Sequence, residues 1–305
     1  MPLDEAGACA TELGTIRVGV HRQGPLPTQG LESFDILLTA DPAAPRPWVG
    51  AADLDGAVAQ LTEAAARQPV AATVAAQVMR MTLKMSFTDS LALESLGYSM
   101  LLWSHALRAW RAATPVRDRG DADQPRVALS RRDDGTISIH MTRPKARNAV
   151  DARMRDALAD AFQFAIDDPD QAPVELSGEG PSFSAGGDLD EFGQASDPGL
   201  AHLIRVLRAP VRLVHQIRER VTVKVQGACV GAGIEIPAAA GRVVARPDAY
   251  FRLPEVSMGL IPGAGGTASI PRRIGRERAC YMAVSGLDLD AETALSWGLV
   301  DAVES

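Results

Sequence analysis

The amino-acid sequence predicts an α/β fold, a parallel or mixed β-sheet covered by helices, with a helical region ahead of it. Two observations lead to this prediction. From residue 136 onward, short stretches of alternating apolar residues take turns with stretches whose apolar residues recur every three or four positions. The chain is also long enough for one large core, since 46% of its 305 residues are hydrophobic.

The first 52 residues form a leader to which the sequence assigns no role. Weak strand patterns occur at residues 16–20 and 34–38. Three prolines between positions 42 and 47 then interrupt any regular element, because proline fixes φ and lacks an N–H donor. We therefore expect a largely irregular segment with two short strands.

A helical region of two or three packed helices is predicted for residues 53–115. Apolar residues recur at helical spacing in three consecutive stretches, and the third predicts one helix over residues 88–110. Thr114-Pro115 ends the region, because the residue before a proline avoids the helical conformation. The apolar side of the third helix comprises Leu91, Ala92, Leu96, Met100, Trp103 and Leu107.

A charged segment, residues 116–135, separates the helices from the rest of the chain. It contains five Arg and five Asp and almost nothing apolar, which is typical of a solvated linker. The α/β core is then expected to occupy residues 136–305.

The core begins with a strand at residues 137–141, where apolar residues alternate. Asp151 follows as the cap of a helix with apolar residues at every fourth position. Further strands are predicted around Val174 and at residues 221–225, and each leads into a glycine-rich turn.

Composition excludes several classes of protein. A net charge of −7 argues against a nucleic-acid-binding surface, and no apolar stretch is long enough to span a membrane. The three cysteines are widely spaced, which does not fit a disulfide framework or a zinc site. We expect a cytoplasmic protein without a metal, a membrane span or a nucleic-acid partner.

The two glycine-rich turns have the chemistry of an oxyanion hole. One spans residues 184–188 and the other residues 231–235, and each comes directly after a predicted strand. A small-residue turn that opens a helix leaves backbone N–H groups without a partner. Two such turns placed face to face would direct two donors at one carbonyl oxygen.

Two carboxylates accompany these turns. Glu235 lies in an otherwise apolar segment, and Glu255 follows the predicted strand at residues 250–251. Apolar surroundings raise the pKa of a carboxyl group, whereas a helix N-terminus stabilises its charged form. A pair of glutamates beside a glycine-rich turn therefore suits general acid and base chemistry.

Four motifs resemble those of the crotonase superfamily, the enoyl-CoA hydratases and isomerases. They read TRPKARNA at 142–149, FSAGGDL at 183–189, GACVGAGIE at 227–235 and LPEVSMGLIPGAGGT at 253–267. Their order and spacing match over roughly residues 127–303. The resemblance implies a crotonase-like ββα spiral core that binds coenzyme A thioesters as substrates and needs no cofactor.

The resemblance also implies roles for single residues. The backbone N–H groups of Gly187 and Ala232 would bind the thioester oxygen as it becomes an enolate. Glu235 matches the carboxylate that deprotonates water for attack at C3, and Glu255 the one that moves a proton at C2. The coenzyme A and substrate-binding residues would be Lys145, Ala146, Arg147, Asn148, Ala185, Asp188, Leu189 and Asp190.

Members of this family carry about 60 residues of helices after their last core strand, and these helices cover the active site and build the trimer. Here the chain reaches Ser305 directly after that strand, and the helical region at residues 53–115 resembles the missing helices. We therefore expect trimerisation helices moved to the front of the chain, and a homotrimer or hexamer. An unrelated helical extension is the alternative.

Hydration of a 2-enoyl-CoA to a 3-hydroxyacyl-CoA is the expected reaction, because both glutamates are present. The alternatives are an enoyl-CoA isomerase, which needs mainly Glu255, and a member resembling the arylacetyl-CoA dioxygenases. A crotonase without catalysis that acts as a scaffold is a further alternative.

Overall fold

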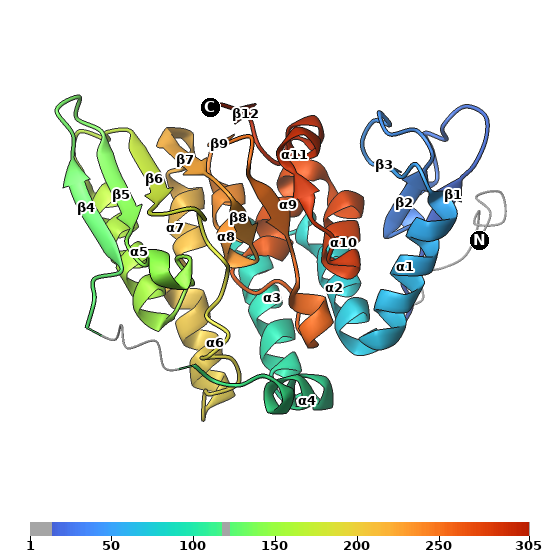
Figure 1. Cartoon of the computed structure of the whole chain (residues 1–305), viewed down its shortest axis with the longest axis horizontal. Helices are drawn as coiled ribbons and strands as arrows, with labels where there is room; N and C mark the ends of the chain where they lie inside the picture. The colour runs from blue at the N-terminus through green and yellow to red at the C-terminus, as the bar shows by residue number, and fades with distance from the viewer. Residues whose placement is uncertain (1–13, 118–122, 305) are drawn as a thin grey trace.

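A six-stranded sheet forms the centre of the protein, and the computed structural model describes residues 14–117 and 123–304 (Figure 1). The strands run parallel, except that the edge strand β4 pairs antiparallel with β5. Their order is β12 (Ala302–Val303), β9 (Arg242–Ala245), β7 (Val221–Val225), β6 (Val174–Gly178), β5 (Ile137–Met141) and β4 (Val127–Arg131). The prediction of an α/β fold with a mixed sheet is confirmed.

Helix α5 (Ala152–Asp167) covers this sheet as the apolar pattern predicts. Met154, Leu158 and Phe162 are buried, and the Asp151 side chain caps the helix by accepting a hydrogen bond from the Met154 N–H. The other helices of the core are α6 (Pro198–Leu207), α7 (Pro210–Gln216), α8 (Ala232–Glu235), α9 (Gly266–Ile274), α10 (Arg276–Ser285) and α11 (Ala291–Trp297).

A second, smaller sheet lies beside the first. β8 (Ala228–Val230) pairs parallel with β10 (Tyr250–Arg252), and β10 pairs antiparallel with β11 (Leu289–Asp290). β8 is largely buried, β10 buries Phe251 between two exposed residues, and the two strands lead into the segments that hold Glu235 and Glu255. This sheet therefore positions both glutamates.

The prediction of a linker over residues 116–135 is wrong for its second half. β4 occupies residues 127–131 and pairs with β5 from Val127 opposite Met141 to Arg131 opposite Ile137. An edge strand exposes its side chains, so a charged and weakly apolar sequence suits it. Residues 118–122 of the segment lie outside the described part of the chain.

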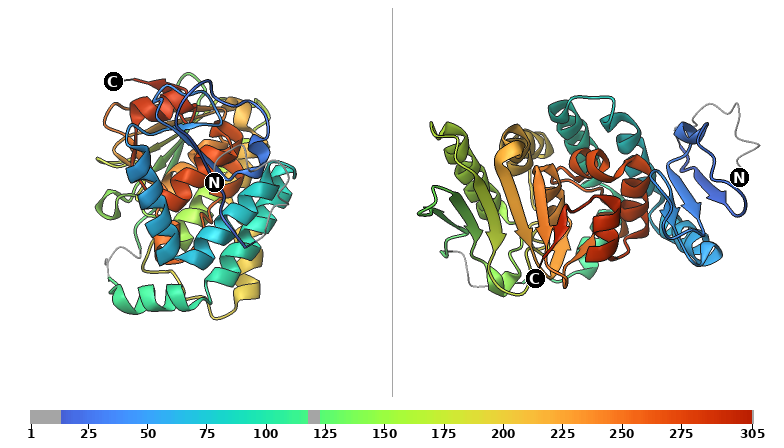
Figure 2. Two further views of the ribbon diagram at one scale, coloured as in Figure 1. Left: turned by 90° about the vertical axis from the view of Figure 1, so that its right-hand side faces the viewer. Right: turned by 90° about the horizontal axis from the view of Figure 1, so that it is seen from above.

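The predicted helical region consists of four helices. They are α1 (Leu54–Arg67), α2 (Pro69–Thr82), α3 (Phe87–Leu101) and α4 (His105–Ala113). The single helix predicted over residues 88–110 is thus two helices, because Ser104 starts a new one by accepting a hydrogen bond from the Leu107 N–H at 3.1 Å. α2 and α3 pack against α9, and α2 also packs against α10 of the core (Figure 2).

The apolar side predicted for the helix at residues 88–110 is buried only in part, at Leu91 and Leu107. Leu96, Met100 and Trp103 are more than half exposed, whereas the polar Glu94 and Ser95 are buried. Polar groups can be buried at low cost when they are hydrogen-bonded, and both of these side chains have partners on neighbouring helices or turns. Hydrogen bonds across helices therefore decide which face of α3 turns inward.

The leader folds into a three-stranded parallel sheet at the end of the molecule opposite β4 (Figure 1). Its strands are β1 (Val18–His21), β2 (Ile36–Thr39) and β3 (Val49–Gly50), and the first 13 residues lie outside the described ranges. Arg276 and Arg278 of α10 donate hydrogen bonds to backbone carbonyls of this unit, including Phe34 O at 2.6 Å and Trp48 O at 2.9 Å.

A buried ion pair ties the leader to α2. Arg80 donates to both carboxylate oxygens of Asp35, at 2.7 and 2.6 Å, and the Arg17 N–H donates to the same carboxylate at 2.9 Å. The Asp35 side chain is 2% exposed and that of Arg80 is 11% exposed.

Within residues 14–117 and 123–304, no helix combines the length and apolarity that crossing a membrane requires.

We expect Arg80→Met to lower the free energy of unfolding by about 3–5 kcal/mol, because it leaves the buried Asp35 carboxylate without its charged partner. Urea denaturation measures the change. Arg67→Met is the matched control, since Arg67 pairs with Glu63 on the exposed surface of α1 and its loss is expected to cost about 1 kcal/mol or less. Equal effects of the two substitutions would contradict the role of the Asp35 pair.

Candidate active site

The structure brings the two glycine-rich turns together. The Ser184 N–H donates to Ala228 O at 3.0 Å, and the Val230 N–H donates to Ser184 O at 3.0 Å, so the first turn pairs with β8. The backbones approach so closely that a Cβ on Gly186 would lie 2.6 Å from Val230 O, and one on Gly233 would lie 2.4 Å from Ser184 O. Glycine is therefore required at both positions.

Gly187 and Ala232, whose N–H groups are predicted to form an oxyanion hole, both line one cavity of about 350 Å³. Neither N–H donates a hydrogen bond to another residue of the described chain. The neighbouring amides do have partners, since the Asp188 N–H donates to Val150 O and the Gly231 N–H to Arg252 O. Two unused donors thus remain available at the cavity wall.

Glu235 lies at the end of α8 and is 1% exposed. Its Oε2 accepts hydrogen bonds from the N–H groups of Ala264 and Gly266, at 2.7 and 2.8 Å. Burial raises the pKa of Glu235 to about 7, against the lowering effect of these two hydrogen bonds. One carboxyl oxygen is therefore held in place, and the group can change protonation near neutral pH.

Glu255 faces Glu235 across Gly231. A Cβ on Gly231 would lie 2.3 Å from Glu255 Oε1 and 3.7 Å from Glu235 Oε1, so the two oxygens are no farther apart than the sum of these distances. Glu255 Oε2 is buried without a hydrogen-bond partner in the described chain. Burial, and then the charge of Glu235, raise the pKa of Glu255 well above its usual value.

A third buried carboxylate, Glu94, belongs to the same site, and the motif reading did not identify it. Its Oε1 accepts from the Gly265 N–H at 2.7 Å, and its Oε2 accepts from the Thr267 N–H and hydroxyl at 2.9 and 2.7 Å. Burial and the charge of Glu235 raise its pKa to about 8. An acidic residue among the leucines of the 91–96 segment was a signal of the same kind as that of Glu235.

The predicted coenzyme A loop is only partly open to solvent. Lys145 and Arg147 are exposed, whereas Ala146 and Asn148 are buried. The Asn148 amide donates to three backbone carbonyls of the following turn, among them Phe183 O at 3.0 Å, and its oxygen accepts from the Arg143 N–H at 2.9 Å. The side chain of Asn148 thus fixes the loop beside the glycine-rich turn at residues 184–188.

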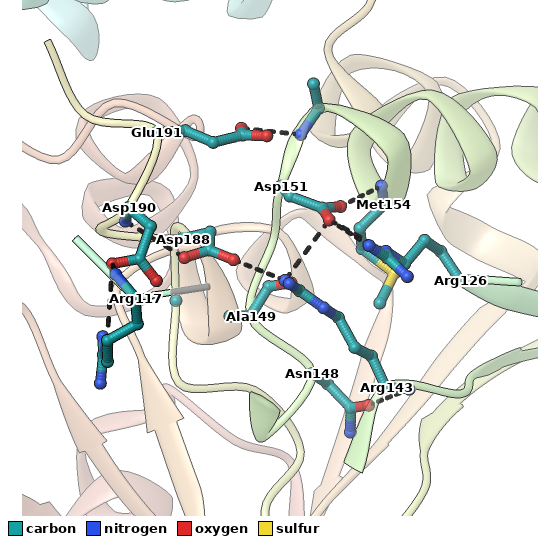
Figure 3. A network of polar contacts seen from close by, with 12 residues as sticks. Arg117, Arg126, Arg143, Asn148, Ala149, Asp151, Met154, Asp188, Asp190 and Glu191 are labelled. Carbon is teal, nitrogen blue, oxygen red and sulfur yellow. Dashed lines mark hydrogen bonds and ion pairs between the residues drawn. The ribbon is translucent and has the colours of Figure 1, made fainter. Parts of the chain in front are cut away.

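Asp188 also serves the architecture of the turn. Arg143 donates to it at 2.6 Å and lies 3.4 Å from Asp151, which Arg126 binds at 2.7 Å (Figure 3). All four side chains are buried. This ion-pair network holds the glycine-rich turn at residues 184–188 against the start of α5.

Contacts from the end of the helical region hold the next two predicted residues. Arg111 of α4 donates to Leu189 O at 2.5 Å, and the Arg117 N–H donates to the Asp190 side chain at 3.0 Å. Ala185 donates its N–H to Arg147 O at 2.8 Å, which joins the coenzyme A loop to the turn. The segment 185–190 is thus fixed from both sides.

Comparison with known proteins places these features in a family. The sequence profile of the enoyl-CoA hydratase/isomerase family matches residues 131–305. An enoyl-CoA isomerase/hydratase of Mycosarcoma maydis is 31% identical over 178 residues, which are 55% of this chain and 65% of that protein. A carnitinyl-CoA dehydratase of Salmonella paratyphi A is 32% identical over 177 residues, 55% of this chain and 64% of that protein.

Solved structures show the same fold. The enoyl-CoA hydratase of Thermoplasma volcanium has 33% identity and a TM-score of 0.54 over 59% of this chain and 72% of that chain. The enoyl-CoA hydratase of Bacillus anthracis has 27% identity and a TM-score of 0.54 over 59% and 70% of the two chains. The chain spans less than two thirds of the length of the curated relatives named above. With the matched residues covering more than half of it, the chain belongs to the enoyl-CoA hydratase/isomerase family, the crotonase superfamily.

Proposed function

We propose that this chain hydrates a 2-enoyl-CoA to a 3-hydroxyacyl-CoA. The observation that carries the proposal is the meeting of Glu235 Oε1 and Glu255 Oε1 at Gly231, next to Ala232, in a cavity that has two unused backbone donors. A hydratase needs two carboxyl groups at one double bond, one to deprotonate water and one to protonate carbon. Isomerisation alone would need one of them.

The two predicted oxyanion donors would supply the electrostatic stabilisation of the transition state. In this proposal the N–H groups of Gly187 and Ala232 bind the thioester oxygen, which becomes negative as water adds to C3. One such donor contributes about 3–4 kcal/mol in acyl transfer, so two donors are a major part of the rate enhancement. The donor of Ala232 is its backbone, so its methyl group does not prevent this role.

The protonation states of Glu235 and Glu255 during the reaction follow from their raised pKa values. Ionised Glu235 takes a proton from water as the oxygen–C3 bond forms, and protonated Glu255 gives its proton to C2 as the C2=C3 double bond is lost. Because the charge of ionised Glu235 raises the pKa of Glu255, the proton favours Glu255 again after the product leaves. The resting state before each turnover is then ionised Glu235 beside neutral Glu255.

Coenzyme A binding is assigned to the loop and turn described above. The exposed Lys145 and Arg147 are placed to meet the phosphates, while Ala146 and Asn148 shape the loop. Ala185, Asp188, Leu189 and Asp190 would line the pantetheine path, of which Asp188 reaches the cavity.

We also propose that α1–α4 are the covering helices of the family, placed ahead of the core. The support is that α3 delivers Glu94 to the turn that holds Glu235, and that α4 binds the oxyanion segment through Arg111. An unrelated extension would have no reason to complete the site.

Glu235→Gln is expected to reduce hydration of crotonyl-CoA by about 100- to 10,000-fold, because the amide cannot accept a proton from water. Loss of the conjugated thioester absorbance measures the rate. Isomerisation of a 3-enoyl-CoA should survive in this variant and disappear in Glu255→Gln. Glu63→Gln, an exposed glutamate of α1, is the control. Full hydration by Glu235→Gln would contradict the proposed reaction, and retained isomerisation with no hydration in the wild type would identify an isomerase.

The activity is expected to rise with pH through about 7, because Glu235 must lose its proton to act as a base and its pKa lies there. A pH–rate profile of kcat in the wild type checks this. An acid limb near the ordinary glutamate pKa of about 4.3 would show that Glu235 is not the base.

Stability should fall as pH rises in the same range. The folded-state pKa of Glu94 is about 8 against an ordinary value of 4.5, so the ionised form disfavours the fold. Its contribution is fully present below pH 4.5 and is lost as pH rises through 8. We expect Glu94→Gln to reduce the difference in unfolding free energy between about pH 5 and about pH 9 by about 1–3 kcal/mol. Urea denaturation at both pH values tests this, and an unchanged difference would contradict it.

A further inference from the structure

Helices α3 and α6 build one wall of the active-site cavity, and that wall is not purely apolar. α3 contributes Leu91, Ser95 and Tyr98, and α6 contributes Ile204 and Arg205. The two helices pack directly against each other. A simple hydrocarbon acyl group would be expected to meet only apolar side chains here, so the arginine requires an explanation.

Neutral groups alone hold Arg205 in place. Its Nη1 donates to the hydroxyl oxygens of Ser95 and Ser99, each at 2.9 Å, and its guanidinium lies 4.6 Å from the centre of the Tyr98 ring. Nε and Nη2 make no hydrogen bond to any residue that the structure describes. The guanidinium is therefore oriented, but two of its nitrogens still have donors to offer.

No described carboxylate lies within ion-pair distance of Arg205. Arg208, directly after α6, binds Asp156 and Asp160 at 3.3 and 2.8 Å. Glu94 lies close enough for its charge to act on Arg205, but both of its oxygens already accept hydrogen bonds from Gly265 and Thr267. Burial lowers the pKa of Arg205, which is the sign of a cation that lacks compensation.

A second cation lines the same cavity. Arg155 of α5 reaches it, and its charge further lowers the pKa of Arg205. The partner of Arg155 is its sequence neighbour Asp156, at 2.9 Å, which Arg208 also binds. Acidic side chains line other parts of the cavity, so the favourable place for an anion is the stretch of wall that holds Arg155 and Arg205. The acidic residues are Glu94, Asp151, Asp188, Glu191, Glu235 and Glu255.

We propose that Arg205 binds a carboxylate at the far end of the acyl group, so that the substrates are thioesters of short unsaturated dicarboxylic acids. The proposal rests on the proposed function for the reaction itself. A carboxylate suits the site because it neutralises the guanidinium and can accept hydrogen bonds from two of its nitrogens at once. A hydroxyl group would accept a hydrogen bond without neutralising the charge.

Binding of saturated thioesters tests the proposal without requiring turnover. Glutaryl-CoA and pentanoyl-CoA have acyl groups of five carbons and differ in a terminal carboxylate against a methyl group. By titration calorimetry, we expect the wild type to bind glutaryl-CoA about 10- to 100-fold more tightly. Arg205→Gln should bring the ratio of the two affinities close to one, and Arg205→Lys, which keeps the charge, should restore part of it.

Arg208→Gln is the matched control, since it removes an arginine of the same segment that already has two acidic partners, and it should leave the ratio unchanged. Equal binding of the two thioesters by the wild type would overturn the proposal, as would an Arg205→Gln protein that keeps the ratio. These two ligands do not react, so their binding is independent of the proposed reaction. If the wild type prefers glutaryl-CoA but hydrates neither crotonyl-CoA nor the five-carbon unsaturated diacid thioester, the Arg205 site is supported and only the proposed reaction is overturned.

Discussion

Four consecutive backbone N–H groups at the start of α9 alternate between two buried carboxylates, and the site depends on this arrangement. Ala264 and Gly266 donate to Glu235, while Gly265 and Thr267 donate to Glu94. Glu235 and Glu94 thus bind the same turn, residues 264–267, and both hold it in place. This turn also fixes the position of Glu235 relative to Glu255.

This arrangement has an electrostatic cost that the fold must offset. Three carboxyl groups are buried near one another, and burial raises the pKa of each. The N–H groups at the start of a helix partly compensate the negative charge, and the raised pKa values allow the cluster to hold protons near neutral pH. The same features that make the cluster costly make it able to transfer protons, which is a common property of catalytic sites.

Much of the fold could be predicted from the sequence because the core has strong local patterns. Alternating apolar residues marked β5, and Asp151 marked the start of α5. The edge strand β4 was not predicted, because its exposed side chains leave no apolar pattern. The inward face of α3 was predicted only in part, because the hydrogen bonds that Glu94 accepts and that Ser95 forms with distant residues outweigh the apolar stripe. Such bonds leave no periodic signal.

The candidate site, like the fold, could be predicted from the sequence only in part. Gly187, Ala232, Glu235 and Glu255 lie in compact motifs, so their proximity follows from two turns and two strands that pair. Glu94 and Arg205 lie outside those motifs, and their parts in the site are visible only once α3 is placed against α6 and α9. Their roles depend on packing between segments far apart in the chain.

The order of the helices has a consequence for synthesis on the ribosome. Glu94 and its partner Thr267 are 173 positions apart, and the helix is made first. At typical rates of translation, α3 waits about 10–30 seconds before the turn that it binds has been made. During that interval its carboxylate stays hydrated and ionised, and the surfaces of α2 and α3 that pack against α9 have no partner yet. The nascent chain therefore passes through a stage in which α3 exists before the turn that binds its Glu94 side chain.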